Sequence, residues 1–232
     1  MHPYSVSDAV KKRVLGRRDR VIAMDQLDAA RSAFVVVDMQ NYFVGKGFPS
    51  EVPMAHEIVP AINQMAAALR AAGGTVIWIQ TTSVGALQTW VTHHNCFLSA
   101  KAAAKRIAQL SEDTEDFRLY PALEARPEDL RVKKIKFSAM IQGSSDLPAV
   151  LAQRGIDTLL IGGTTTNVCC ESTARDASML DFRVAMLSDC NAAWTDEQHA
   201  GTLDNFQVIF GDVMNNDEAI SRLVPAAKRR SA

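Results

Sequence analysis

A cysteine at the start of an expected helix is the strongest sign of chemistry in this 232-residue chain. The apolar residues 159–161 stop at paired glycines, and threonines 164–166 precede a helical pattern that holds Cys169 in its first turn. This order predicts a strand, a tight turn and a helix N-terminus. Unpaired backbone N–H groups and the helix dipole favour a thiolate there, so Cys169 is the candidate nucleophile. A lone cysteine is more often a buried packing residue, and that is the role expected of its neighbour Cys170.

Two charged residues beside apolar strands could complete a site built around this thiol. Asp38 ends the apolar run 34–38, where it could be a simple polar strand end. Beside a thiol it would be a general base, because a neutral thiol is a poor nucleophile near pH 7. Lys134 lies in the basic stretch 133–136, which alone is typical of a solvated surface. As a fixed cation within ~4–6 Å of both groups, it would favour the ionised acid and the thiolate.

Strand-like and helix-like patterns alternate along the chain and must position these residues. Single helices between strands imply right-handed crossovers and a sheet covered on both faces. We therefore predict an α/β fold: a three-layer α/β/α sandwich with a mostly parallel, roughly six-stranded doubly wound sheet. Ligands of such folds lie beyond the carboxyl ends of the strands, where Asp38 and Cys169 fall. The predicted strands are 34–38, 75–80, 131–136, 158–161, 183–187 and a short 208–210; the predicted helices are 55–72, 99–110, 147–154, 169–180 and 196–206.

The chain is long enough for one large domain with additions at its ends. We expect an N-terminal arm over residues 1–30, a main domain over 31–225 and a C-terminal tail over 226–232. The basic stretch 11–20 would be a solvated arm or a subunit contact. Residues 81–130 are long for a connection, and such segments are usually lids or binding loops. Substrate identity is expected to depend on this insertion.

Taken together, the three segments around Asp38, Lys134 and Cys169 resemble the isochorismatase-like cysteine hydrolases. This superfamily includes nicotinamidases, N-carbamoylsarcosine amidohydrolases and ureidoacrylate amidohydrolases. The resemblance runs over about residues 33–213, and its specific part is Thr-Asn-Val-Cys-x-Glu-Ser-Thr-Ala-Arg-Asp-Ala. It implies that the three residues form the family's catalytic triad. Lys134 is selected among nearby lysines because the family lysine stands four residues before a serine, here Ser138.

The resemblance also implies an activity. The motif is closest to the ureidoacrylate and N-carbamoyl branch, which implies a cofactor-independent amidohydrolase acting on a small ureido or carboxamide substrate. The reaction would pass through a thioester and release ammonia or an amine. The oxyanion hole would consist of the backbone amides of Thr165 and Cys169, after a cis peptide between Gly163 and Thr164. The pocket candidates flank the motif ends: Gln40, Asn41, Phe43, Trp78, Gln80, Phe137 and Met140.

Two other functions are considered. A true isochorismatase breaks a vinyl ether and, within this resemblance, carries glycine at the position of Cys169. A non-catalytic binding subunit would have no chemical need for all three residue types of the triad.

Adjacent histidines, His93 and His94, invite comparison with a metal site. Nicotinamidases bind a metal through an aspartate and two spaced histidines in this region. Adjacent side chains rarely converge on one ion in regular structure, so we expect no metal here.

Composition excludes several classes of protein. A net charge of -1 argues against a nucleic-acid partner. No apolar run approaches the ~18 residues of a membrane span, and no secretory signal pattern begins the chain. The spacing of the four cysteines fits free thiols in a reducing compartment, so a cytoplasmic protein is expected. The resemblance implies a homo-oligomer, either a dimer or a tetramer.

Overall fold

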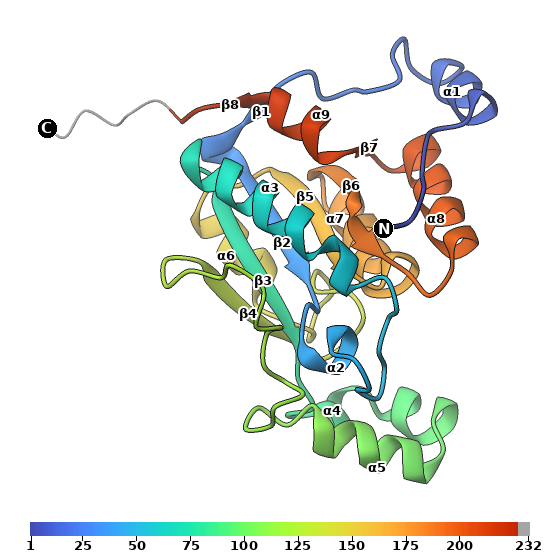
Figure 1. Ribbon diagram of the computed structural model, residues 1–232, viewed down its shortest axis with the longest axis vertical. Helices are drawn as coiled ribbons and strands as arrows, with labels where there is room; N and C mark the ends of the chain where they lie inside the picture. The colour runs from blue at the N-terminus through green and yellow to red at the C-terminus, as the bar shows by residue number, and fades with distance from the viewer. Residues whose placement is uncertain (227–232) are drawn as a thin grey trace, which may run out of the picture.

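A six-stranded parallel sheet forms the centre of the protein, in the strand order β4-β3-β2-β5-β6-β7 (Figure 1). The computed structural model describes residues 1–226. The predicted α/β class and parallel sheet are confirmed. The strands are β2 (Ser32–Val37), β3 (Thr75–Thr81), β4 (Leu130–Lys134), β5 (Thr158–Thr164), β6 (Arg183–Ala192) and β7 (Asp212–Met214).

Helices cover both faces of this sheet. Helices α3 (Val59–Ala71) and α9 (Asn216–Ser221) lie on one face. Helices α6 (Leu147–Gln153), α7 (Glu171–Met179) and α8 (Asp196–Ile209) lie on the other. This is the three-layer sandwich expected from the alternating pattern.

The central strand β2 shows why both faces must be covered. All of its residues are buried, as expected for a strand of a parallel sheet. Because side chains alternate along a strand, Phe34 and Val36 pack with α3, whereas Val35 and Val37 pack with α6, α7 and α8.

The predicted strand at 208–210 is wrong. Helix α8 continues to Ile209, and the sixth strand, β7, begins only at Asp212. Val208 is buried against Val10 and Val14 of an N-terminal helix, so the apolar residues belong to the last turn of α8. A short apolar run fits either structure in sequence, and packing against the N-terminal helix decides it here.

The predicted insertion between β3 and β4 carries short helices beyond the carboxyl ends of the strands (Figure 1). It contains α4 (Ala86–Thr89), a π-helical turn (His93–Phe97) and α5 (Ala100–Gln109). The predicted helix 99–110 is confirmed as α5, with Ser99 as its N-cap. No residue of α5 is buried, so the insertion packs loosely compared with the sheet.

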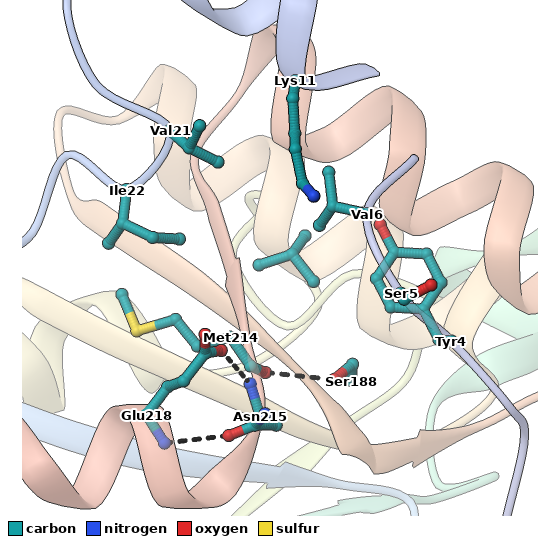
Figure 2. A pocket seen from close by; sticks show the side chains of 11 residues that line it. Tyr4, Ser5, Val6, Lys11, Val21, Ile22, Ser188, Met214, Asn215 and Glu218 are labelled. Atoms are coloured by element: carbon teal, nitrogen blue, oxygen red, sulfur yellow. Dashed lines mark hydrogen bonds between the residues drawn. The ribbon is translucent and has the colours of Figure 1, made fainter. Parts of the chain in front are cut away.

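The N-terminal residues pack on the rest of the protein. Helix α1 (Asp8–Leu15) packs against α8, and the short strand β1 (Leu27–Asp28) pairs with β8 (Leu223–Val224). A hollow of about 280 Å³ lies between this N-terminal segment and residues 213–218. Figure 2 shows the side chains that line it. The division into arm, domain and tail remains a prediction. All of the predicted tail 226–232 except residue 226 lies outside the described residues.

Candidate active site

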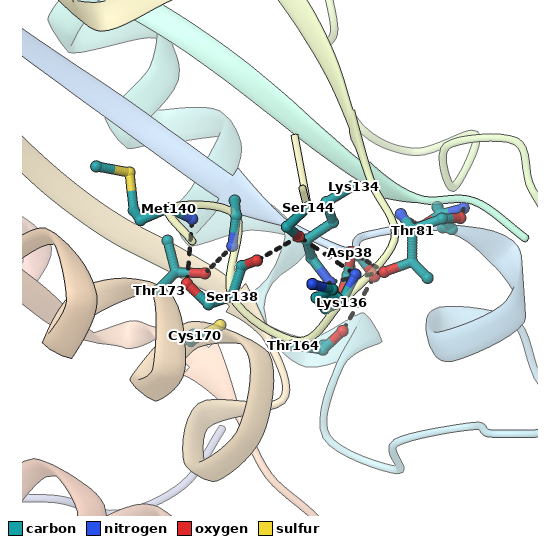
Figure 3. Close-up of polar contacts among 12 residues, drawn as sticks. Asp38, Thr81, Lys134, Lys136, Ser138, Met140, Ser144, Thr164, Cys170 and Thr173 are labelled. Atoms are coloured by element: carbon teal, nitrogen blue, oxygen red, sulfur yellow. Dashed lines mark hydrogen bonds and ion pairs between the residues drawn. The ribbon is translucent and has the colours of Figure 1, made fainter. Parts of the chain in front are cut away.

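Three neighbouring strands end in one buried polar network (Figure 3). Asp38 follows β2, Thr81 ends β3 and Lys134 ends β4. The Lys134 ammonium lies 2.7 Å from Oδ2 of Asp38 and donates a 2.7 Å hydrogen bond to Oγ1 of Thr81. Thr81 in turn donates to Oδ1 of Asp38 over 2.8 Å. Acid, hydroxyl and ammonium group therefore hold one another in place.

The backbone of Asp38 has an uncommon conformation. Its φ is 54°, in the left-handed region that residues with a Cβ seldom adopt. Its N–H donates to the Ile79 carbonyl at 3.0 Å, and its own carbonyl accepts from the Thr164 hydroxyl at 3.0 Å. Both neighbouring strands thus hold the carboxylate at this edge of the sheet.

The candidate nucleophile comes from the next strand along the sheet. Cys169 lies in a π-helical turn (Thr166–Cys170) between β5 and α7. Gly163, with φ 116°, lets β5 run unusually close to β2, because a Cβ there would lie 2.0 Å from the Val37 carbonyl oxygen. That close approach brings the thiol turn to the Asp38 edge.

Electrostatics keep this thiol neutral at rest. Burial raises the pKa of the Cys169 thiol to about 12; Lys134 opposes this shift and Asp38 adds to it. The expected preference for a thiolate at a helix start is therefore outweighed by desolvation. A proton acceptor is needed before Cys169 can attack.

Asp38 is placed to be that acceptor. Burial alone would lower the pKa of Lys134, but its attraction to Asp38 and Cys169 wins, so the pKa is raised and the ammonium stays charged. Oδ2 of Asp38 lies 2.7 Å from the Lys134 ammonium, and a side-chain hydrogen bond to Asp38 adds to the raised pKa of the Cys169 thiol. A carboxylate oxygen has two lone pairs, so one of them can still accept the thiol proton.

The turn before Cys169 differs in one respect from the expectation. The cis peptide joins Thr164 and Thr165, one residue later than the predicted bond between Gly163 and Thr164. Gly163 still belongs to β5, and the strand ends at Thr164. Within residues 1–226 the Thr165 amide has no hydrogen-bond acceptor, so it can donate to a bound group.

Three of the predicted pocket residues donate hydrogen bonds to the insertion. The side-chain amides of Gln40 and Gln80 both donate to the Phe117 carbonyl at 2.9 Å. Asn41 donates to the Glu115 carbonyl at 2.9 Å. These buried amides fasten residues 115–117 to the strand ends.

Two further candidates lie in the core away from the thiol. Trp78 and Phe43 pack in the cluster around α3, and the Trp78 indole donates to Asp129 over 2.8 Å. Cys169 packs in the cluster on the opposite face of the sheet. Because side chains alternate between the faces of a strand, Trp78 faces α3, and its role as a pocket residue stays a prediction.

The last two candidates lie on the Cys169 side of the sheet. Met140 is buried in the same cluster as Cys169. Phe137 is partly exposed and its ring meets Trp90 edge to face at 4.7 Å, while Trp90 stacks on His93 at 4.0 Å. We call Trp90, His93 and Phe137 the aromatic cluster. It borders a groove of about 370 Å³ that runs along α7.

The two adjacent histidines have different surroundings. His94 is buried and bonds through Nδ1 to the Trp90 carbonyl, and its ring stands nearly perpendicular to that of His93. Within residues 1–226 no group of three or more His, Cys, Asp or Glu side chains is arranged to hold a metal ion.

Sequence reasoning missed two residues. Thr81 links the Asp38 carboxylate to the Lys134 ammonium. In the sequence, a threonine at a strand end gives no sign of such a role. Arg106 of α5 is close enough to influence the pKa values of Lys134, Cys169 and His93. In sequence it is one of several cations in an alanine-rich helix.

The sequence of this protein is similar to one family of known hydrolases. The isochorismatase domain pattern matches residues 32–218. A ureidoacrylate amidohydrolase of Methylorubrum extorquens is 31% identical, over 86% of this chain and 88% of its own length. Another, of Pseudomonas savastanoi pv. phaseolicola, is 29% identical over 95% of this chain and 94% of its own.

Solved structures agree with these relatives. A cysteine hydrolase from Pseudomonas syringae pv. phaseolicola has a TM-score of 0.74 and 30% identity, covering 84% of this chain and 93% of its own. An N-carbamoylsarcosine amidase from Thermoplasma acidophilum, at 21% identity and a TM-score of 0.62, shows the same fold over 81% of this chain and 97% of its own.

A parallel α/β/α sandwich with a thiol, a carboxylate and an ammonium group at its carboxyl edge defines a hydrolase of the cysteine type. This chain belongs to the isochorismatase family, as the match over most of its length establishes. The family expected from the motif is confirmed.

Proposed function

We propose that this protein is an amidohydrolase in which Cys169 attacks the carbonyl carbon of a small ureido or carboxamide substrate. The observation that carries the proposal is the buried Asp38–Thr81–Lys134 network at the edge of the sheet from which the Cys169 turn emerges. The relatives' names as ureidoacrylate amidohydrolases support the same reaction class.

The first half of the reaction uses Asp38 as a base. Oδ2 takes the thiol proton, and Sγ of Cys169 forms a bond to the carbonyl carbon. Lys134 stabilises the negative charge that remains near the site. The Thr165 amide, together with the Cys169 amide, donates to the oxyanion. When the tetrahedral intermediate collapses, the C–N bond breaks and Asp38 returns its proton to the leaving nitrogen.

The second half releases the acid product. Water loses a proton to Asp38 and attacks the thioester carbon, and the C–S bond breaks. The proton on Asp38 returns to the Cys169 sulfur. One water is consumed and one ammonia or amine is released, so the chain needs no redox partner for this step.

Access to the site requires movement. Cys169 is 6% exposed, Lys134 1% and Asp38 0%. Substrate therefore enters only when the insertion shifts away from the strand ends. Segments with few buried residues, such as α5, open at low cost.

Assembly and location are part of the same proposal. Leu87, Val91 and Phe97 of the insertion are exposed, and an exposed apolar patch of this kind marks a contact surface. We expect a homo-oligomer that covers it, measurable by light scattering. The four free thiols fit a cytoplasmic protein. Within residues 1–226 no helix could cross a membrane.

The test is ammonia release from ureidoacrylate, N-carbamoyl amino acids and nicotinamide. Wild type and Cys170→Ser should release ammonia from at least one compound, and Cys169→Ser should not. Cys170 is the matched control, because it is the adjacent buried cysteine. Full turnover by Cys169→Ser would exclude the mechanism. Tight binding without turnover by the wild type would favour a binding subunit.

A further inference from the structure

Two buried histidines lie behind the Cys169 turn, and the proposed reaction uses neither of them. His199 of α8 is 0% exposed, and His2, in the segment before α1 (residues 1–7), is 5% exposed. Their rings stack with centroids 4.6 Å apart. Figure 1 shows the N-terminus beside α8. Because burying an imidazole costs free energy unless its nitrogens are bonded, the polar contacts of the two rings indicate what the pair does.

His199 holds the first residue of the turn that carries the nucleophile. Its Nδ1 is hydrogen-bonded to Oγ1 of Thr166 at 3.0 Å, and both side chains are fully buried. The Thr166 carbonyl also accepts from the Glu171 amide, which closes the π-helical turn around Cys169. The Thr202 hydroxyl, one turn after His199 in α8, donates to the Glu171 carboxylate at 3.3 Å. Helix α8 therefore contacts this turn at both of its ends.

His2 fixes the ring of His199 from the other side. Nδ1 of His2 lies 2.6 Å from the Asp196 carboxylate. Its Nε2 lies 3.0 Å from the amide nitrogen of Ala193 and 3.1 Å from the carbonyl oxygen of the same residue. Ala193 directly follows β6, and Asp196 begins α8. The His2 ring is thus bonded across the connection between β6 and α8 while its face covers His199.

The segment before α1 has a second contact with α8 that does not involve the turn. The Tyr4 hydroxyl donates to Asp204 at 3.0 Å, further along the helix. The Tyr4 ring meets His199 edge to face at 6.0 Å. Loss of the hydroxyl alone would loosen the segment but leave the bonds of His2 and Thr166 intact, so Tyr4 offers a matched control.

His199 stays neutral in these surroundings. Burial lowers the pKa of its imidazole to about 4, and the ring of His2 lowers it further, whereas the Ser188 carbonyl and Asp196 oppose the shift. A neutral imidazole has one donor and one acceptor nitrogen, so its bond to the Thr166 hydroxyl persists at neutral pH.

We propose that His199 is a positioning residue for the nucleophile, and that His2 makes the geometry of the Cys169 turn depend on the segment before α1. This inference rests on the proposed role of Cys169 as the nucleophile. The turn also supplies the Thr165 and Cys169 amides proposed as oxyanion donors, so the bond from His199 sets the sulfur and these donors together. A reacting group misplaced by about 1 Å costs about 10²-fold in rate.

The histidine pair could instead only stabilise the fold. That role would lower the free energy of unfolding but leave the kinetics of the folded protein unchanged. The experiment therefore measures kcat, KM and the pH profile of Cys169 alkylation at a temperature where circular dichroism shows each variant to be folded.

Two variants remove the bond to the turn from its two ends. His199→Leu keeps an apolar side chain of similar bulk, and Thr166→Val loses a single hydroxyl, so it decides the question if His199→Leu does not fold. With the compound that the wild type cleaves best, each variant should lower kcat roughly 10- to 100-fold and change KM less than about threefold. The double variant should lose no more than the larger single loss, because one bond is removed.

A third variant tests rescue. His199→Asn places an amide near the position of Nδ1 and should recover part of the loss. Wild-type kcat in folded His199→Leu and Thr166→Val would overturn the proposal.

The role of His2 is tested by His2→Ala, with Tyr4→Phe as control. In His2→Ala, His199 keeps its bond to Thr166 but loses the ring that covers it, so kcat should fall about fivefold, as for a lost aromatic pair. Tyr4→Phe keeps its ring against His199 and should keep wild-type kcat. Equal kcat in the two variants would overturn the dependence on this segment.

Alkylation by iodoacetamide does not depend on turnover, and peptide fragmentation separates Cys169 from Cys170 and Cys96. In the wild type the rate should rise about tenfold per pH unit up to about pH 10, because burial raises the pKa of the Cys169 thiol. In Thr166→Val the released turn admits water, so the profile should bend toward that of an ordinary thiol near pH ~8.5.

The alkylation profile also separates this inference from the proposed reaction. An unchanged profile in both Thr166→Val and His199→Leu would overturn the positioning role. If the wild type cleaves no compound of the panel, the amidohydrolase proposal fails by itself, and the profile still decides whether His199 holds the Cys169 turn.

Discussion

The carboxyl edge of the sheet and the insertion between β3 and β4 lie side by side but are built differently. At the sheet edge, Asp38, Thr81 and Lys134 are buried and bonded to one another. In the insertion, α5 has no buried residue. A rigid edge suits chemistry, which needs fixed distances. A loosely packed insertion suits admission and choice of substrate.

Removing the base at the rigid edge should have the largest effect. We expect Asp38→Asn to lower kcat by about 10²–10⁴-fold, because the thiol, with its raised pKa, loses its proton acceptor. Ammonia release measures this. Asp113→Asn in the exposed part of the insertion is the control and should keep wild-type kcat. A similar loss in both variants would contradict the comparison between the two regions.

Stability should respond to the same ion pair. Lys134→Met alone leaves the Asp38 carboxylate buried without its cation, so the free energy of unfolding should fall by about 3–5 kcal/mol. Combining it with Asp38→Leu should restore most of that loss without restoring activity. Urea unfolding of the two single variants and the double variant measures the coupling. Additive losses in the double variant would show that the pair is not energetically linked.

Thr81 should matter less than either charged partner. Thr81→Val keeps the shape of the side chain but removes the hydroxyl that bonds Asp38 and Lys134. The free energy of unfolding should therefore fall by about 1–3 kcal/mol relative to the wild type. We also expect kcat/KM to fall about tenfold. Thr81→Ser retains the hydroxyl and should recover most of both losses. Failure of serine to recover them would indicate a packing role.

The neutral resting thiol gives a pH test. The pKa of Cys169 is about 12, so its alkylation by iodoacetamide should rise about tenfold per pH unit from pH 7 to 10. A small free thiol should level off near pH ~8.5. Because the folded pKa is raised above the unfolded value, the linked stability is complete below about pH 8.5 and declines as the pH rises toward 12. A plateau near neutral pH would mean that the thiolate is already formed at rest.

The smallest effect on activity and stability is expected when a helix cap in the insertion is removed. Ser99 caps α5 and Ser7 caps α1, each by accepting from a backbone N–H. Ser99→Ala should loosen α5 by about 1 kcal/mol, seen as roughly fivefold faster amide exchange, with a few-fold change in KM. Global unfolding should hardly change. Ser7→Ala is the matched control and should leave KM as it is.

Local patterns in the sequence were sufficient for the fold and for placing Asp38 and Cys169 at one edge of the sheet. Apolar runs of strand length, separated by helical patterns, can form only a parallel sheet with buried faces, and Asp38 and Cys169 follow two of its strands. Lys134 was selected from the motif, and strand alternation explains the choice: Lys133 is exposed and pairs with Glu112, whereas Lys134 is buried.

Other features depend on contacts between distant segments. Val208 and Ile209 are helical, in the last turn of α8, where α1 packs on Val208. Trp78 lies on the α3 face, and no pattern in a strand buried on both sides tells which face is which. The pKa of Cys169 follows from burial by several segments, and the Ser83 hydroxyl, just after β3, holds α5 through the Ile107 carbonyl. The periodicity of apolar residues in a sequence predicts which helix or strand each segment forms. The distances between side chains on different helices and strands are fixed only when these elements pack together.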